Sequence, residues 1–267
     1  MASGVLGRDV QTERKTRPNR SIAILDVGFG CGDQTWELAK ALEAPTWKDY
    51  RYVGLTLDPA QHEIAQQRQE REITSANRNG IKLWPGSFRL FRADAAKPES
   101  WDRPVRDVVG ALGSSQFTDK WFVALDCLYH FSPSRAPIFR YSAQTLGANL
   151  MAFDLLLNDK VTWFGILTLK TLSLLSGSPS GAFITEQRYI AQLVASGYDK
   201  DSIKINDVTY DVLPGLVAYL DRQQRALAPY GISLGKYKVA RRLFKWFSDS
   251  GTVRAAIIVA KLKEKNS

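Results

Sequence analysis

Short apolar runs rich in β-branched residues alternate along the chain with longer segments of helical periodicity. The apolar runs predict strands at residues 22–27, 52–57, 88–92, 121–125, 150–157, 203–212 and 253–262. Such alternation is typical of a doubly wound, mostly parallel sheet, so we expect an α/β fold with seven strands. No internal repeat or low-complexity linker divides the sequence, which favours one domain over residues 1–267, with an N-terminal extension over 1–20.

Helices are predicted between these strands, at residues 34–42, 60–73, 135–146 and 185–196. The second has a clear start signal, because Asp58 can cap the first turn and Pro59 stands at the first helical position. Gly197 marks the end of the last one. These boundaries support the alternating pattern.

Two late segments, 158–184 and 213–248, interrupt this regularity. Both are apolar and rich in aromatic residues, which include Trp163 and Phe164 in the first and Phe244 in the second. Open α/β sheets bind ligands at the carboxyl edge of their strands. We therefore expect the two segments to form a helical cap over an apolar or aromatic substrate, with ordinary core helices and a membrane-facing surface as the alternatives.

The composition sets further bounds. With 267 residues and 45% hydrophobic side chains the chain can bury a large core, which excludes global disorder. Its apolar stretches are shorter than the about 20 residues of a membrane-spanning helix, and residues 1–20 lack the apolar segment of a secretory signal. Two cysteines, Cys31 and Cys127, provide neither a disulfide framework nor zinc-ligand spacing. We expect a cytoplasmic protein without a metal.

The net charge of +9 would attract phosphates or an anionic membrane, but acidic residues are mixed with the basic ones along most of the chain. Two basic clusters stand out. One places Arg241, Arg242 and Lys245 beside aromatic residues, and the other is formed by the lysines at 261, 263 and 265. The first is typical of an amphipathic helix at a membrane interface, so peripheral membrane contact stays open.

A glycine-rich loop follows the first predicted strand. Asp26 precedes three alternate glycines, Gly28, Gly30 and Gly32, and a predicted helix begins directly afterwards. Glycines let the backbone turn sharply and let a ligand approach with no Cβ in the way. A dinucleotide-binding loop would need a glycine where Asp33 stands, and the Gly-Lys-Ser/Thr of a Walker loop is absent. A simple strand-to-helix turn is the alternative to a ligand site.

This loop resembles the first motif of the class I S-adenosyl-L-methionine (SAM)-dependent methyltransferases. SAM carries a sulfonium and an amino group, and an acid at the strand end suits both cations. The resemblance implies a Rossmann-like, seven-stranded fold with SAM as cofactor. It also implies that Asp26 lies near the methionine amino end, that Gly28, Gly30 and Gly32 pack beneath the cofactor, and that Gln34 belongs to the binding site.

The segment 53–61 resembles the second motif of the subgroup that is similar to cyclopropane-fatty-acid synthases. Many class I enzymes end this strand with an acid that holds the ribose, whereas this sequence has Thr56. In the subgroup the equivalent residues line the adenosine, which implies that role for Thr56, Leu57 and Gln61. A core position is the alternative for Leu57.

Asp94 and Ala95, after the third predicted strand, are similar to the adenine-binding segment of the same family. The resemblance implies that the carboxylate accepts a hydrogen bond from the exocyclic amine and that the next backbone amide meets the ring. Asp94 as a turn residue is the alternative.

The fourth predicted strand leads into Asp126, Tyr129 and His130. This stretch resembles that of the sugar O-methyltransferases of natural-product pathways, in which a histidine is the base and an aspartate on the fifth strand orients it. The resemblance implies His130 as base, Asp154 as its orienting partner and Tyr129 beside them, with Asp126 among the cofactor-binding residues. His is suited to deprotonating a hydroxyl or amine acceptor, while a structural histidine is the alternative.

We therefore expect methyl transfer to a hydroxyl or amine of a moderately apolar small molecule of secondary metabolism. Transfer to carbon of a lipid or sterol is the first alternative, and a non-methylating SAM-fold or nucleic-acid-binding protein is the second. Nucleic acid is not an expected partner, because the Pro-Pro-Tyr/Phe box, the Pro-Cys nucleophile and an RNA-binding appendage are all absent. The protein is expected to be a monomer or a homodimer.

Overall fold

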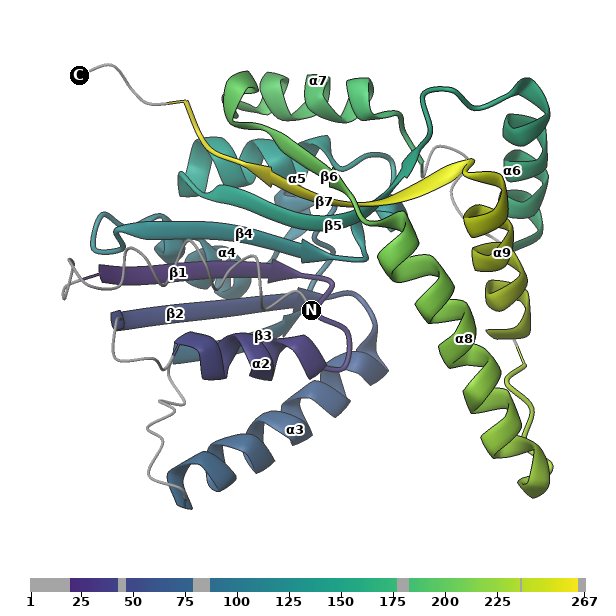
Figure 1. The fold of residues 1–267 in the computed structure, drawn as a ribbon. Coiled ribbons are helices and arrows are strands. Elements are labelled where there is room, and N and C mark those ends of the chain that lie inside the picture. Colours follow the sequence, from purple (N-terminus) through teal and green to yellow (C-terminus); the bar gives the residue numbers. More distant parts are fainter. Residues whose placement is uncertain (1–19, 43–46, 79–86, 177–182, 236, 264–267) are drawn as a thin grey trace. The chain divides into compact units, whose positions relative to one another are not determined.

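The computed structural model describes residues 20–42, 47–78, 87–176, 183–235 and 237–263. The described strands form one seven-stranded sheet in the order β3-β2-β1-β4-β5-β7-β6 (Figure 1). Their bounds are β1 Arg20–Val27, β2 Trp47–Thr56, β3 Phe88–Arg92, β4 Asp119–Leu125, β5 Asn149–Leu157, β6 Lys204–Asp207 and β7 Val253–Ala260. The predicted doubly wound α/β fold with seven strands is confirmed.

The helices between the strands are α2 Asp33–Leu42, α3 Pro59–Arg78, α4 Arg103–Gly110, α5 Ala136–Arg140, α6 Trp163–Ser176, α7 Glu186–Ser196, α8 Thr209–Leu227 and α9 Tyr237–Ser250. None of the described helices is long and apolar enough to cross a membrane. The chain divides into two compact units. Unit 1 runs to Ala124 and includes Arg140–Leu150, and unit 2 comprises Leu125–Phe139 and the chain from Met151 onward.

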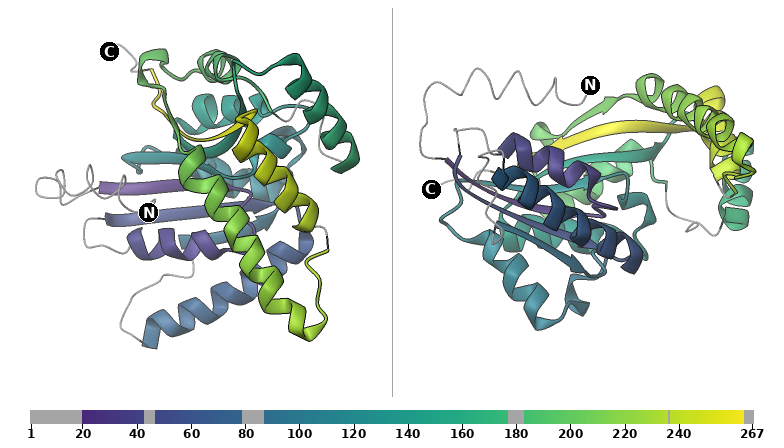
Figure 2. Two further views of the ribbon diagram at one scale, coloured as in Figure 1. Left: turned by 45° about the vertical axis from the view of Figure 1, so that its right-hand side comes forward. Right: turned by 90° about the horizontal axis from the view of Figure 1, so that it is seen from below.

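Unit 1 is built on parallel pairing of β1 with β2 and β4, and of β2 with β3. Helices α2 and α3 pack against β2, and α3 also packs against β3 (Figures 1 and 2). Trp36, Tyr50 and Tyr52 surround Phe88, with ring centroids 5.4 to 5.5 Å from it. Aromatic pairs at this spacing add to the free energy gained from apolar burial. Through Trp36, this cluster fixes α2 on the half of the sheet that carries the glycine loop.

Helix α3 of unit 1 begins where the sequence predicts. Oδ1 of Asp58 accepts hydrogen bonds from the backbone amides of Ala60 and Gln61, at 2.8 and 3.1 Å, and α3 begins at Pro59. The predicted cap is therefore confirmed. Helix α4 was not predicted from the sequence, although Asp102 caps it in the same way.

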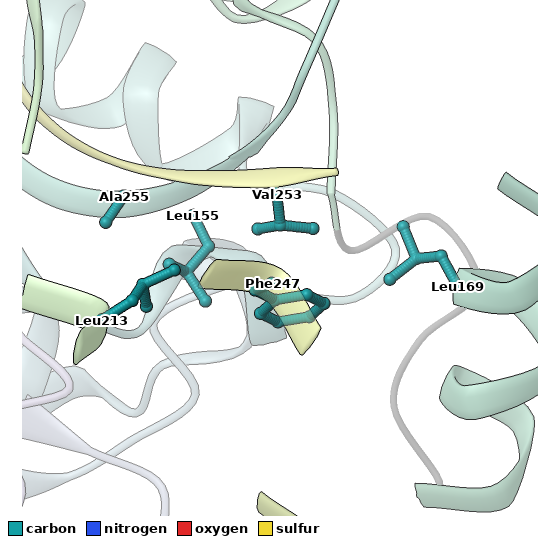
Figure 3. Close-up of a cluster of buried hydrophobic side chains, with 6 residues drawn as sticks. All are labelled: Leu155, Leu169, Leu213, Phe247, Val253 and Ala255. Atoms are coloured by element: carbon teal, nitrogen blue, oxygen red, sulfur yellow. The ribbon is translucent and has the colours of Figure 1, made fainter. Parts of the chain in front are cut away.

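Unit 2 has its own apolar core. Its antiparallel pair is β6 with β7. Leu155, Leu169, Leu213, Phe247, Val253 and Ala255 form a buried cluster that joins β5, α6, α8, α9 and β7 (Figure 3). The two late, apolar segments of the sequence therefore contain helices that are anchored to strands of this unit.

The prediction of a strand over 203–212 is wrong beyond β6, because α8 begins at Thr209. The carboxylate of Asp207 accepts the amide of Thr209 at 2.9 Å, which turns the chain out of the sheet. The predicted helix 135–146 consists of α5 and a π-helical turn, Tyr141–Leu146, that ends at Gly147 in the left-handed conformation. Residues 1–19 and 177–182 and Lys265, which figure in the sequence predictions, lie outside the described residues.

Candidate functional site

The carboxyl ends of three neighbouring parallel strands bring the predicted cofactor residues of unit 1 to one edge of the sheet. The register pairs Val27 with Leu55 and Thr56 with Arg92, so β1, β2 and β3 end side by side. Backbone hydrogen bonds continue beyond the strands, from the amide of Gly28 to Leu55 at 2.7 Å and from that of Ala93 to Thr56 at 2.9 Å. This edge is where open α/β sheets bind ligands.

The glycine loop needs its glycines. Gly30 and Gly32 have φ angles of +61° and +82°, in the left-handed region that side chains with a Cβ rarely adopt. A Cβ on Gly32 would lie 3.3 Å from Cβ of Ala65 in α3, so this glycine allows the loop to pack closely on that helix. A Cβ on Gly30 would meet no protein atom within 4 Å. The backbone of Gly30 is therefore open to a ligand.

Asp26 lies buried at the end of β1. Its carboxylate accepts a hydrogen bond from the Tyr52 hydroxyl, which in turn lies 2.9 Å from Oγ1 of Thr35. Burial raises the pKa of Asp26 to about 7, although the Tyr52 hydrogen bond opposes this rise. No cationic side chain pairs with Asp26 within the described ranges. A cationic ligand placed beside it would stabilise the ionised form, which fits a sulfonium or ammonium group.

The end of β2 contributes a polar contact and an exposed apolar side chain. Thr56 is buried, and its Oγ1 donates to Oε1 of Gln61 at 3.0 Å. Leu57 is 62% exposed, so the core alternative for this residue is wrong. An exposed leucine next to the open glycine loop is suited to contact the face of a ring.

The turn after β3 gives Asp94 several local partners. Oδ1 accepts the amide of Ala96 at 3.0 Å, Oδ2 lies 3.5 Å from Nζ of Lys97, and the backbone carbonyl accepts the indole N–H of Trp101 at 2.8 Å. Ala95 is buried. The carboxylate thus stabilises the turn in the manner of the alternative interpretation. Gln34, in the first turn of α2, is exposed.

The residues that the sequence predicts to act on the methyl acceptor belong to unit 2, and Asp126, Tyr129 and His130 lie in the loop that follows β4. Asp126 has a φ of +61°, which is unusual for a residue with a Cβ and costs about 1 to 3 kcal/mol. Its amide donates to the Phe153 carbonyl at 2.9 Å, and its carboxylate accepts the Tyr129 hydroxyl at 3.0 Å. Asp126 remains exposed, but loss of hydration to the surrounding protein raises its pKa. Burial raises the pKa of Tyr129, and the neighbouring Asp126 carboxylate raises it further, so this phenol stays protonated.

His130 lies beside Tyr129, with ring centroids 4.2 Å apart. Its backbone amide donates to the Cys127 carbonyl at 3.0 Å, which fixes the turn, and the residue as a whole is exposed. Partial loss of hydration lowers the pKa of His130 below its usual 6.5. The imidazole is therefore neutral at pH 7 and able to accept a proton.

Asp154 does not hold the partner that the sequence predicted. Oδ2 of Asp154 pairs with Nη1 of Arg135 at 2.8 Å, and Oδ1 accepts the amide of Leu155 at 2.9 Å. No hydrogen bond joins Asp154 to His130 within the described part of the chain. Both members of the pair with Arg135 are buried, and burial raises the pKa of Asp154 to about 6 while Arg135 lowers it.

Arg135 and Tyr189 are the residues that sequence reasoning missed. The guanidinium carbon of Arg135 lies 5.2 Å from the centroid of the buried Tyr189 ring, a cation–π distance. An aspartate inside an apolar strand such as β5 is stabilised by a buried cation or by a cationic ligand, and this was the available signal. The signal does not identify the cation, because Arg135 stands 19 residues before Asp154 and outside the strand.

The comparisons with known proteins concern the fold. The sequence matches no family model and no curated protein. Its structure resembles that of the phosphoethanolamine N-methyltransferase 2 of Haemonchus contortus in complex with SAM, with a TM-score of 0.64 and 11% identity, over 98% of this chain and 53% of that one. This chain therefore spans about half the length of that enzyme.

Two further solved structures are similar over most of their own length. A cyclopropane synthase from Mycobacterium tuberculosis matches with a TM-score of 0.62 and 15% identity, over 96% of this chain and 84% of the other. The [4+2]-cyclase SpnF matches with a TM-score of 0.56 and 17% identity, over 96% and 80%. The fold of this chain is that of the class I SAM-dependent methyltransferases.

Proposed function

We propose that this protein is a SAM-dependent methyltransferase that acts on a hydroxyl or amine of a moderately apolar small molecule. The observation that carries the proposal is the open glycine loop over a buried, cation-free carboxylate, Asp26, at the carboxyl edge of β1. The fold supports it, because solved methyltransferases share it. SAM, when bound, supplies an electrophilic methyl group on a sulfonium sulfur.

The residues of unit 1 would hold the cofactor. Asp26 stabilises positive charge at the amino end, and Gly28, Gly30 and Gly32 allow close approach of the ligand to the backbone. The polar pair of Thr56 with Gln61 presents hydrogen-bonding groups toward a ribose, and the exposed Leu57 packs on the adenine. We assign Asp94 and Ala95 to the adenine edge and Gln34 to the cofactor site at the first turn of α2. Asp126, which belongs to unit 2, is a further proposed cofactor-binding residue.

The acceptor would be activated by unit 2. Methyl transfer from a sulfonium is an in-line displacement, and it depends mainly on alignment. We propose that His130, neutral at pH 7, removes the proton of the hydroxyl or ammonium acceptor as the new bond forms. Tyr129 stays protonated, and its hydroxyl donates to the Asp126 carboxylate. Asp154 acts at a distance, because its ion pair with Arg135 ties the loop that carries His130 to β5.

The cap, the cellular compartment and the oligomeric state are also proposals. We place the segments 158–184 and 213–248 as a cap over the acceptor, and we place the reaction in the cytoplasm, in a monomer or homodimer. Two alternatives have a specific observation in their favour. Transfer to carbon is favoured by the segment 53–61 and its likeness to cyclopropane synthases, and a non-methylating reaction is favoured by the similarity to a cyclase.

Calorimetry of SAM binding tests the cofactor site. We expect Asp26→Ala and Gly30→Val to weaken SAM affinity by about tenfold or more, since one removes a buried charge and the other fills the open approach. Gly147→Val is a matched control, because Gly147 has a φ of +63° and equally open surroundings outside the proposed site. Equal losses in Gly30→Val and Gly147→Val, or unchanged affinity in Asp26→Ala, would contradict the site.

Turnover tests the base. Isotopically labelled SAM incubated with metabolite extracts would identify the acceptor and the atom that is methylated. With that acceptor, His130→Ala should lower kcat by about 10²-fold and leave SAM affinity intact. His62→Ala is the control, because His62 bonds to the Leu90 carbonyl in unit 1. Full activity of His130→Ala would make this histidine structural, and an alkene acceptor would favour transfer to carbon.

A further inference from the structure

Helix α6 carries apolar side chains on its outward side. Trp163, Phe164 and Leu167 are 65%, 61% and 56% exposed, whereas Leu169 is buried in the core of unit 2. At 100° per residue, Leu169 and Gly165 fall on one side of the helix and the three exposed residues on the opposite side. We propose that this outward side, together with the cationic stripe of α9, binds peripherally to an anionic lipid surface.

An apolar face of this size is unusual in contact with water. Helices at the surface of globular proteins bury their apolar side and expose a polar one, but α6 is apolar on both. Trp163 and Phe164 stack on each other with ring centroids 3.5 Å apart, so the exposed aromatic surface is continuous. A contiguous exposed apolar patch marks a contact surface for a partner or a membrane.

The composition of the patch favours a lipid interface. Tryptophan is enriched at the level of the lipid headgroups, and a lysine next to an apolar face can extend its ammonium group toward the water. Lys170 is exposed and lies one helical turn from Leu167 and two from Trp163, on the same side of α6. With 14 residues, α6 is too short to span a bilayer and long enough to lie in the interface.

Helix α9 supplies the charge complementarity. Lys238, Arg242 and Lys245 follow each other at spacings of four and three residues, so they line one side of α9, and all three are exposed. Lys245 pairs with Asp249, whereas neither Lys238 nor Arg242 forms an ion pair in the described part of the chain. Basic residues on such a helix attract anionic lipid headgroups.

The two helices belong to one surface region of unit 2. Leu169 of α6 and Phe247 of α9 share a buried cluster (Figure 3). Leu243 and Phe244 pack against this cluster. Figure 1 shows α6 and α9 on the same side of unit 2. Insertion of the outward side of α6 therefore brings α9 close to the same lipid surface.

Sedimentation with vesicles tests the proposal on the full chain. We expect binding to phosphatidylcholine vesicles that contain phosphatidylglycerol, little binding to phosphatidylcholine alone, and a blue shift of tryptophan emission on binding. The variant Trp163→Ser/Phe164→Ser should bind at least about tenfold more weakly, because two inserted aromatic side chains are lost. Lys238→Gln/Arg242→Gln should weaken binding about tenfold at low salt and less at high salt.

Tyr210→Ser is the matched control, because Tyr210 is 85% exposed on α8 and lies outside both features. It should bind vesicles like the unchanged protein. Equal binding by Trp163→Ser/Phe164→Ser, or a shift of that variant from dimer to monomer in light scattering without any vesicle binding, would overturn the proposal. Binding to RNA in place of vesicles would also overturn it. SAM affinity should be unchanged in all these variants, so failure here leaves the proposed function standing.

Discussion

Asp26 in unit 1 and Asp154 in unit 2 are both buried carboxylates, and they differ in their partners. Asp26 lies at the end of β1, and Asp154 lies inside β5. Asp154 in unit 2 pairs with a permanent cation, Arg135, at 2.8 Å. Asp26 in unit 1 accepts a hydrogen bond from the neutral hydroxyl of Tyr52 and has no cationic partner among the described residues, and burial raises its pKa to about 7. A buried acid with a resident cation holds a structure together, whereas one without a cation is free to serve a cationic ligand.

The difference also separates the chemistry of the two units. In unit 1 the proposed binding groups follow three adjacent strands, each within a few residues of its strand end. In unit 2 the candidate base His130 lies in a loop whose end is tied to β5 by the Arg135–Asp154 pair. The stability of the fold should therefore depend more on Asp154, and the affinity for SAM more on Asp26.

The largest effect is expected from Asp154→Ala. Removal of one member of a buried ion pair leaves Arg135 without a countercharge, which lowers the free energy of unfolding by about 3 to 5 kcal/mol. Chemical denaturation measures this loss. Asp154→Leu/Arg135→Met should recover most of it, because no buried charge remains. Asp107→Ala breaks an exposed pair with Arg103 and should change stability little, so similar losses at both sites would refute the contrast.

A smaller effect is expected from pH on SAM affinity. Asp26 is mostly protonated below its raised pKa of about 7, and only the ionised form attracts a cation. Affinity should therefore rise with pH, by about tenfold from about pH 5.5 to about pH 7, where the amino group of the ligand stays protonated. Titration calorimetry across this range measures it. Asp26→Asn should give a flat profile, and a flat profile for the unchanged protein would show that Asp26 faces no cation.

The smallest effect is expected from the helix cap of α3. Asp58→Ala removes two hydrogen bonds to the first turn and should cost about 1 kcal/mol of stability. Asp102→Ala removes the cap of α4 and should cost a similar amount. SAM affinity should fall a few-fold in Asp58→Ala alone, because Leu57 and Gln61 adjoin this cap. If Asp58→Ala and Asp102→Ala bind SAM equally well, the cap of α3 does not support the cofactor site.

Several features of the sequence were sufficient to predict structure. The seven strands, the capped start of α3 and the glycine loop after β1 each depend on residues within a short segment, where periodicity, caps and backbone freedom act. Other features did not follow from local patterns. The run 203–212 reads as one strand, yet the Asp207 hydrogen bond begins α8 at Thr209, and α4 is too short for its periodicity to be clear.

The amino-acid sequence by itself determined the fold class and the loop that we assign to SAM, because both are encoded by contiguous residues. Only the tertiary structure decided that Arg135, rather than His130, is the partner of Asp154, that Leu57 is exposed and that α6 turns an apolar side outward. The physical reason is that burial and pairing of charges depend on which distant segments pack together. A single strand or helix contains no information on the residues that will cover it.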